Sequence, residues 1–204
     1  KKINYVKTSY GIGSSRARNI GIKKSKCNYC AFLDDDDTWD KDYIKNSKKY
    51  LNDSLILIGK IYSMESKKII KNKSNQIKSG QSFETFFVKN PGIIGSNLII
   101  SKKILKHVGG FDKYLPLGQD KAIVIESKFR GYNILRTNSK IYFNENTLGQ
   151  RNTDLIKYII GKIIFYKKYR KKMNFLTKIH YLMLFIKNSI YIVYSYVWNS
   201  GNNK

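Results

Sequence analysis

The chain has 204 residues, of which 42% are hydrophobic and 14% aromatic, and this excludes a disordered chain and allows one domain with a sizeable core. Its 39 Lys and Arg against 14 Asp and Glu give a net charge of +25, which favours anionic partners such as nucleic acid, an anionic membrane or phosphorylated small molecules. Lys, Ile, Asn and Tyr are abundant together, as in proteins from AT-rich genomes, so part of this charge need not serve a function.

The hydrophobic pattern predicts strands that alternate with helices through the first 143 residues. Short apolar runs predict strands over residues 3–7, 28–33, 55–62, 93–100 and 132–143. Capping residues and helical spacing predict helices over residues 14–24, 40–51, 82–88, 102–108 and 119–130. The polar residues 63–79 suit a hairpin or surface excursion. This alternation indicates an α/β fold with a mostly parallel, Rossmann-like sheet.

The character of the chain changes after residue 153, where an apolar helical stripe leads into a basic block at residues 167–172. Residues 175–198 are apolar but interrupted by Lys178, His180 and Lys187, and the uncharged stretches are shorter than the roughly 20 residues of a membrane span. Two readings stand side by side: helices on an anionic membrane surface, or a helical pair packed on the core. We therefore divide the chain into an α/β domain, 1–150, and a basic amphipathic helical tail, 151–204.

The N-terminus and the cysteines bear on the compartment. The first residues lack the apolar core of a signal peptide. Cys27 and Cys30 form a Cys-x-x-Cys pair, for which a metal or redox role competes with two buried or indifferent thiols; a closed zinc site would have to recruit the distant His107 and His180. Thiols without a signal peptide indicate a reducing compartment. We expect a cytoplasmic protein, in solution or on the inner face of the plasma membrane.

Four consecutive aspartates, Asp34-Asp35-Asp36-Asp37, follow the expected strand at residues 28–33. Adjacent carboxylates repel one another unless a cation lies among them. Ligands of α/β folds bind beyond the carboxyl ends of strands, which is where these aspartates stand. The cluster therefore suits an oxygen-ligand site for Mg²⁺ or Mn²⁺, with a solvated acidic turn as the alternative.

Three stretches, taken together and in this order, resemble one family. Residues 13–21 match a G-x-x-x-A-R-N-x-G helix, residues 32–39 match an F-L-D-x-D-D-x-W metal loop, and residues 109–112 with 118–120 match a G-G-F-D … G-E-D acceptor segment. Over residues 3–145 the chain is similar to family 2 glycosyltransferases of the GT-A type, mostly bacterial enzymes that build surface polysaccharides. The resemblance implies a GT-A fold and inverting, metal-assisted transfer from a nucleotide-diphosphate sugar to a glycan or lipid-linked acceptor.

The resemblance also assigns roles to particular side chains. It implies that Asp36 and Asp37 bind the divalent metal and that Asp120 is the base that deprotonates the acceptor hydroxyl. The donor-binding residues that it implies are Arg18, Asn19, Asp34 and Asp35. The residues that it implies for the acceptor or sugar pocket are Trp39, Ser96, Asn97, Gln119 and Arg151.

Two departures from the family pattern keep a second hypothesis open. The strand–loop–strand section with which family members begin has no counterpart here, so we expect a chain truncated at its start. The family's acidic pair is represented by Gln119-Asp120, with a neutral isostere at the first position. An incomplete transferase that only binds its ligands or a membrane is therefore the alternative. We expect no nucleic-acid partner, because no binding motif is present and the acidic cluster would repel a phosphate backbone.

Overall fold

A computed structural model of the protein describes residues 3–65, 68–70, 83–144 and 155–202. Its strands form one sheet, in the order β1-β5-β3-β6-β2, with β4 paired to β3 outside this path. The strands are β1 (Tyr29–Ala31), β2 (Thr38–Trp39), β3 (Leu55–Glu65), β4 (Lys68–Ile70), β5 (Leu98–Ser101) and β6 (Asn133–Asn144). The helices are α1 (Ser14–Lys24), α2 (Tyr43–Lys48), α3 (Thr85–Val88), α4 (Lys102–Val108), α5 (Gln119–Phe129), α7 (Leu155–Tyr169) and α8 (Phe175–Asn202).

The α/β class predicted from the sequence is confirmed, but the sheet is mixed rather than mostly parallel. Only the β3–β6 pair is parallel among the described strands, although it is the longest ladder. The pairs β1–β5, β3–β5, β2–β6 and β3–β4 are antiparallel. An apolar run signals that a strand is buried and carries no sign of its direction, which is why the pairing could not be read from the pattern.

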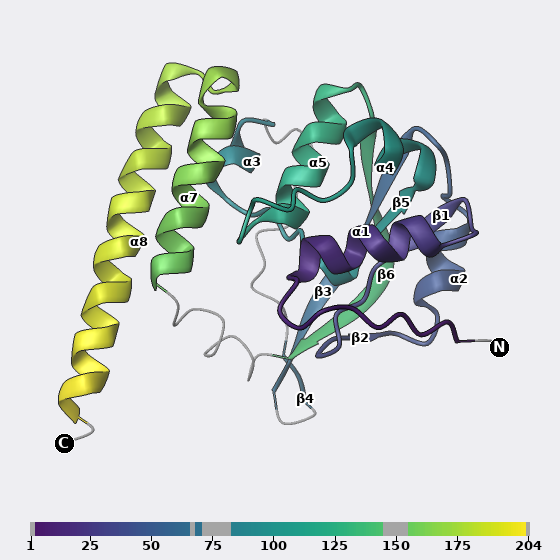
Figure 1. Ribbon diagram of the computed structural model, residues 1–204, viewed down its shortest axis with the longest axis horizontal. Helices are drawn as coiled ribbons and strands as arrows, with labels where there is room; N and C mark the ends of the chain where they lie inside the picture. The colour runs from purple at the N-terminus through teal and green to yellow at the C-terminus, as the bar shows by residue number, and fades with distance from the viewer. Residues whose placement is uncertain (1–2, 66–67, 71–82, 145–154, 203–204) are drawn as a thin grey trace.

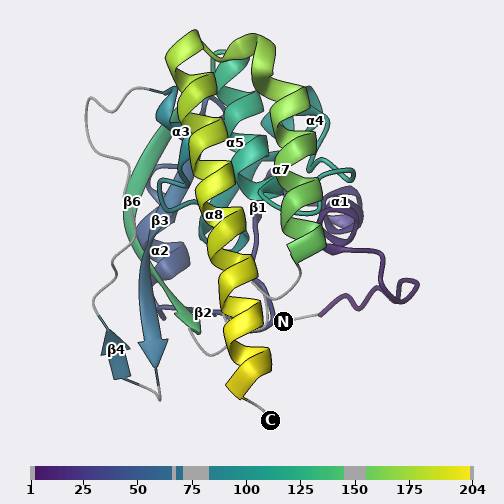
Figure 2. The same ribbon diagram turned by 90° about the vertical axis from the view of Figure 1, so that its left-hand side faces the viewer.

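The main core lies between the sheet and helices α4, α5 and α7. Strands β3 and β5 contribute the fully buried Ile56, Ile58 and Ile100, and α5 contributes Val124 and other residues. Helix α7 closes this core with Phe165 and Tyr169, and Tyr181 of α8 belongs to the same cluster. Figure 1 shows α7 and α8 side by side, and Figure 2 shows the pair in front of α5 and the sheet. The inner face of this pair therefore packs on the core, which agrees with the second of the two interpretations of the tail, a helical pair packed on the core.

Several elements differ from the expectation. Residues 3–7 form no strand, and Ile3, Tyr5 and Val6 are exposed; a strand needs a hydrogen-bonding partner, and no described segment pairs with this one. The expected helix over residues 40–51 is shorter, and residues 175–202 form one continuous helix. The predicted boundary at 150/151 lies outside the described residues and stays a prediction. Within the described residues, we find no helix of the length and apolarity that a membrane crossing requires.

Candidate active site

Arg18 of α1 is paired with the first aspartate of the acidic loop. Its Nη2 donates to Asp34 Oδ1 at 2.5 Å, and the two side chains are 11% and 30% exposed. The guanidinium also lies over the Phe111 ring, with Cζ at 5.3 Å from the centroid. Gly95 backs it closely, since a Cβ built there would come within 2.7 Å of Arg18 Cζ. Arg18 is thus held by a carboxylate, a ring and a backbone from three parts of the chain.

Ser96 fastens the acidic loop to the 3₁₀ turn Gly95–Asn97 that precedes β5. Its Oγ accepts from the Asp34 amide at 3.0 Å and donates to Asp37 Oδ2. Trp39 Nε1 donates to the Ser96 carbonyl at 2.8 Å, and the indole stacks on Tyr43 with centroids 4.7 Å apart. The loop that carries the four carboxylates is therefore fixed at both of its ends.

Ser96 and Asn97 are fully buried, contrary to the expectation that they line a sugar pocket. The Asn97 amide donates to the carbonyls of Gly59 and Gly92, both at 2.9 Å, and its Oδ1 accepts from the Ile94 amide at 3.1 Å. All of its hydrogen-bonding groups serve the backbone, because a buried polar side chain without such partners would be costly. Asn97 holds the turn in place rather than facing a ligand.

Asn19 joins α1 to the turn that resembles the family's acceptor segment. Its Nδ2 donates to the Phe111 carbonyl at 2.7 Å, and its Oδ1 accepts from the Phe111 amide at 2.8 Å. Gly110 has φ +76°, and a Cβ there would come within 2.5 Å of Asn19 Oδ1. The residue at 110 therefore has to be glycine, and Asn19 acts by positioning the turn across 92 residues of sequence.

Asp120 lies in the first turn of α5, two residues after Gly118, which adopts a left-handed conformation. Its Oδ1 accepts from the Lys121 amide at 2.7 Å, and the preceding Gln119 donates from Nε2 to Ser14 Oγ at 2.7 Å. Burial raises the pKa of Asp120, and the positive charges of Arg18 and Lys121 oppose this rise. Asp120 is thus close enough to Arg18 for the charge of the guanidinium to act on it.

Lys121 was missed at the sequence level, since lysines are ordinarily exposed. It is buried, its Nζ donates to the Phe87 carbonyl at 3.2 Å, and it lies 4.3 Å above the Phe165 ring. Burial, reinforced by the nearby charge of Lys162, lowers the pKa of Lys121 to about 7. Its only sequence signal is its position directly before the apolar run at residues 122–125 of α5.

The acidic loop offers hard oxygen ligands that differ in burial. Asp37 is buried, Asp36 is half-buried and Asp35 is exposed. Within the described ranges, no three His, Cys, Asp or Glu side chains gather as a metal site would require. Mg²⁺ is usually held by only one or two protein carboxylates together with water and substrate phosphates. The Asp36 and Asp37 pair therefore fits a cation that shares its coordination with a bound diphosphate.

A hollow of about 580 Å³ opens between α1 and the edge strand β1. Arg18, Asp34 and Asp35 stand on its wall, as do Cys27 and Cys30. Both cysteines are free thiols, with Cys27 exposed and Cys30 buried, and burial raises the pKa of Cys30.

Arg151 lies outside the described residues, so its expected role stays a prediction.

The comparisons with known proteins match the first half of the chain to one family, described as Glycosyl transferase family 2, over residues 1–109. No curated protein matches the chain. Among solved structures, S. aureus TarS 1-349 is 14% identical over 81% of this chain and 53% of that chain, with a TM-score of 0.48. The same protein in complex with UDP-GlcNAc gives 14% identity, 94% and 65% coverage, and a TM-score of 0.49. The chain thus spans about half the length of TarS 1-349, and likeness at this level carries no weight in assigning a ligand.

Proposed function

Since this chain belongs to glycosyl transferase family 2, which matches residues 1–109 of its 204, we propose that it transfers a sugar from a nucleotide-diphosphate donor to an acceptor hydroxyl. The acceptor is a glycan or a lipid-linked molecule, and the reaction serves surface polysaccharide synthesis. The observation that supports the proposal most directly is the Arg18–Asp34 ion pair. It joins α1 and the acidic loop, which carry two of the family-like motifs, and the charge of Arg18 also acts on Asp120.

Arg18 binds the donor diphosphate in this proposal. A guanidinium pairs with phosphate oxygens through parallel N–H donors. Its Nη1 is buried and donates to no group of the described residues, so a phosphate oxygen would satisfy it. Asp34 and Gly95 hold the guanidinium in place, and Asp35, exposed on the wall of the hollow, is available to the donor sugar or ribose.

Asp36 and Asp37 would hold a divalent cation, Mn²⁺ or Mg²⁺, next to the diphosphate. When bound, such a cation neutralises the charge that develops on the leaving diphosphate. Ser96 contributes by positioning, since its hydroxyl donates to Asp37 and accepts from the Asp34 amide. The match to the family ends at Gly109, so the metal loop lies inside the matched residues.

Asp120 is the proposed base, although it lies beyond the matched residues. It accepts the proton of the acceptor hydroxyl as the oxygen attacks the anomeric carbon, and a single displacement of this kind inverts the configuration. Burial raises the pKa of Asp120, which makes the carboxylate a stronger base. Gln119 cannot share this role, because an amide does not titrate and its Nε2 is engaged with Ser14.

Calorimetric titration tests the donor site. The chain is titrated with nucleotide-diphosphate sugars, UDP-GlcNAc among them, with and without Mn²⁺. We expect Mn²⁺-dependent binding that Asp36→Asn weakens by at least about ten-fold. The matched control is Asp53→Asn, which removes the same charge at an exposed position distant in sequence. Binding that is independent of the metal and equal in both variants contradicts the proposed site.

A second candidate function is ligand binding without transfer, which the neutral Gln119 favours. It shares the donor site but predicts no turnover by the chain. A radiolabelled donor with candidate acceptors separates the two: turnover that Asp120→Asn abolishes while donor binding persists excludes the binding-only function.

The tail, 151–204, extends the proposal to the location of the reaction. We propose that α7 and α8 contact the inner face of the plasma membrane, so that a cytoplasmic donor meets a membrane-held acceptor. The outward faces of these helices support this, since large apolar side chains of α8 are exposed there.

A further inference from the structure

Helix α8 carries an apolar stripe on its outward face. Six large side chains at spacings of three and four residues, each 40% to 64% exposed, make up this outer stripe: Ile179, Leu182, Met183, Ile186, Ile190 and Val193. Such spacing places them along one side of the helix. The opposite side is used for packing, since Thr177 and Tyr181 are buried. The outer stripe therefore remains exposed although the opposite side of α8 packs on the core.

Cations border the outer stripe. At about 100° per residue, Lys178 and Lys187 fall on its two margins. Residues 155–202 contain nine Lys or Arg and no Asp or Glu. In the described part of the chain, Lys168 and Lys172 pair with acids of the core domain, and Lys178 and Lys187 form no ion pair. The flanks therefore present positive charge to whatever covers the stripe.

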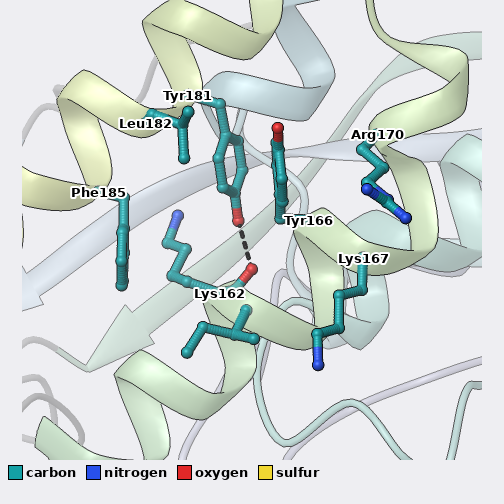
Figure 3. Close-up of a pocket in the computed structure, with 8 residues that line it drawn as sticks. Lys162, Tyr166, Lys167, Arg170, Tyr181, Leu182 and Phe185 are labelled. Atoms are coloured by element: carbon teal, nitrogen blue, oxygen red, sulfur yellow. Dashed lines mark hydrogen bonds between the residues drawn. The ribbon is translucent and has the colours of Figure 1, made fainter.

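A cleft of about 440 Å³ between α7 and α8 joins the outer stripe through Leu182. Its walls are aromatic, with the Tyr166 and Tyr181 rings stacked at 5.5 Å. Figure 3 shows Lys162 on one side of these rings, with Lys167 and Arg170 on the other. None of the described residues that line the cleft is acidic. An apolar groove with cations at its mouth suits an amphiphilic anion.

We infer that the outer faces of α7 and α8 dock on an anionic phospholipid bilayer. The outer stripe lies at the acyl boundary, Lys178 and Lys187 extend to the phosphates, and the cleft receives one lipid headgroup between Lys167 and Arg170. An apolar face bordered by cations, without acids, matches the chemistry of helices that lie on anionic membranes. The inference deepens the membrane contact proposed above by naming the surface and the charge of the lipid.

The same charges argue against a second copy as the occupant. A two-fold dimer brings the same patch of both chains together. Two faces that each carry Lys178 and Lys187 without acids would then oppose one another, and like charges in an interface are costly. The occupant that complements this surface is apolar at its centre and anionic at its rim.

Vesicle co-sedimentation of the full chain tests this, without any nucleotide sugar, so that the result is independent of the transfer reaction. The probes are vesicles of phosphatidylcholine alone and vesicles containing about one third phosphatidylglycerol. We expect binding to the anionic vesicles that high salt weakens. Lys178→Gln/Lys187→Gln lowers the partition coefficient about 25-fold, at about five-fold per lysine near the surface, and Lys167→Gln/Arg170→Gln lowers it by a similar factor.

Two further variants make the result specific to the surface. Lys23→Gln/Lys24→Gln removes the same charge from the exposed end of α1 and keeps the partition coefficient within about two-fold. Ile186→Gln/Ile190→Gln removes two exposed apolar side chains, which a fold maintained by the inner face tolerates, and lowers partitioning at least ten-fold; circular dichroism verifies the fold. Equal binding to both vesicles overturns the inference, as does native binding by the Ile186→Gln/Ile190→Gln variant. A dimer in vesicle-free light scattering that this variant dissociates overturns it too, in favour of a second copy.

Discussion

Gly95→Ala tests whether the position of Arg18 matters for donor binding. The ideal Cβ at residue 95 lies 2.7 Å from Arg18 Cζ and 3.2 Å from Nε. Carbon atoms in contact are separated by about 3.5–4.0 Å, so the guanidinium must retreat by about 1 Å. Gly95 does not have a positive φ, so alanine can adopt its backbone conformation. The change therefore moves Arg18 without altering any charge.

The expected magnitude follows from the contact that is lost. A retreat of this size stretches the 2.5 Å bond from Nη2 to Asp34 Oδ1 toward the limit of a hydrogen bond. Hydrogen bonds to charged groups contribute about 1.5–3 kcal/mol when partners are buried; Asp34 is 30% exposed, so we expect a stability loss of about 1–2 kcal/mol. Because the diphosphate would use the displaced guanidinium, donor affinity should fall about ten-fold to 100-fold.

Gly21→Ala is the matched control for this prediction. Gly21 is in α1, and among the described residues no atom outside its own stretch of helix lies within 4 Å of a Cβ built there. Alanine stabilises a helix by about 0.5–1 kcal/mol relative to glycine. The free energy of unfolding measured in urea should fall for Gly95→Ala and rise for Gly21→Ala. Gly21 lines the same hollow as Arg18 but a Cβ there does not displace the guanidinium, so calorimetry should find a much larger loss of donor affinity for Gly95→Ala. Native affinity in Gly95→Ala would refute the role of Arg18, and an unchanged free energy of unfolding would refute the steric reasoning.

The remaining predictions concern Asp120, Ser96 and Lys121. Asp120→Asn should abolish turnover and raise the free energy of unfolding near neutral pH. Burial raises the pKa of this carboxyl, so the native fold loses stability as pH rises through that raised value, and the uncharged amide avoids this loss. A variant that is less stable than the native protein in urea unfolding would contradict this. For the same reason, the acidic limb of the kcat/KM profile should lie above 3.8, the ordinary pKa of an aspartate, and a limb at or below that value would exclude burial of the base. Ser96→Ala removes the acceptor of the Asp34 amide and the hydroxyl that donates to Asp37, so it should cost about 2–4 kcal/mol in urea unfolding, and a loss below about 0.5 kcal/mol would count against the loop as described. Burial lowers the pKa of Lys121 from 10.5 to about 7, so the unfolded chain binds more protons across that window and stability rises with pH through it. The advantage of Lys121→Met over the native protein should therefore shrink by about 2–3 kcal/mol between about pH 6 and pH 9, and a difference that does not vary with pH would show that Lys121 titrates normally.

Local signals in the sequence were sufficient to predict the α/β class and the helices or strands in or beside which the key side chains lie. The helix at residues 14–24 is α1 as predicted, the apolar run before Asp34 contains β1, and Asp120 opens a helix as expected. These features depend on spacing, capping and turn residues within a few positions of each other, and such information is present in any short window. The family resemblance rests on the same short windows and is confirmed by the match over residues 1–109.

The functions of individual side chains in the fold depended on contacts that no short window contains. Asn19 fastens Phe111, and Ser96 fastens Asp34 and Asp37, across 59 to 92 residues. Ser96 and Asn97 therefore position backbone rather than line a pocket.

The sequence by itself determined which residue types stand at strand ends and helix starts, because backbone propensity and hydrophobic period are local. Only the tertiary structure decided the antiparallel direction of β5, the burial of Lys121 and the outward orientation of the α8 stripe. Each of these depends on which surfaces meet when the helices cover the sheet. Which surfaces come into contact is determined by the packing of the whole chain, which buries apolar area and satisfies the hydrogen bonds of buried polar groups.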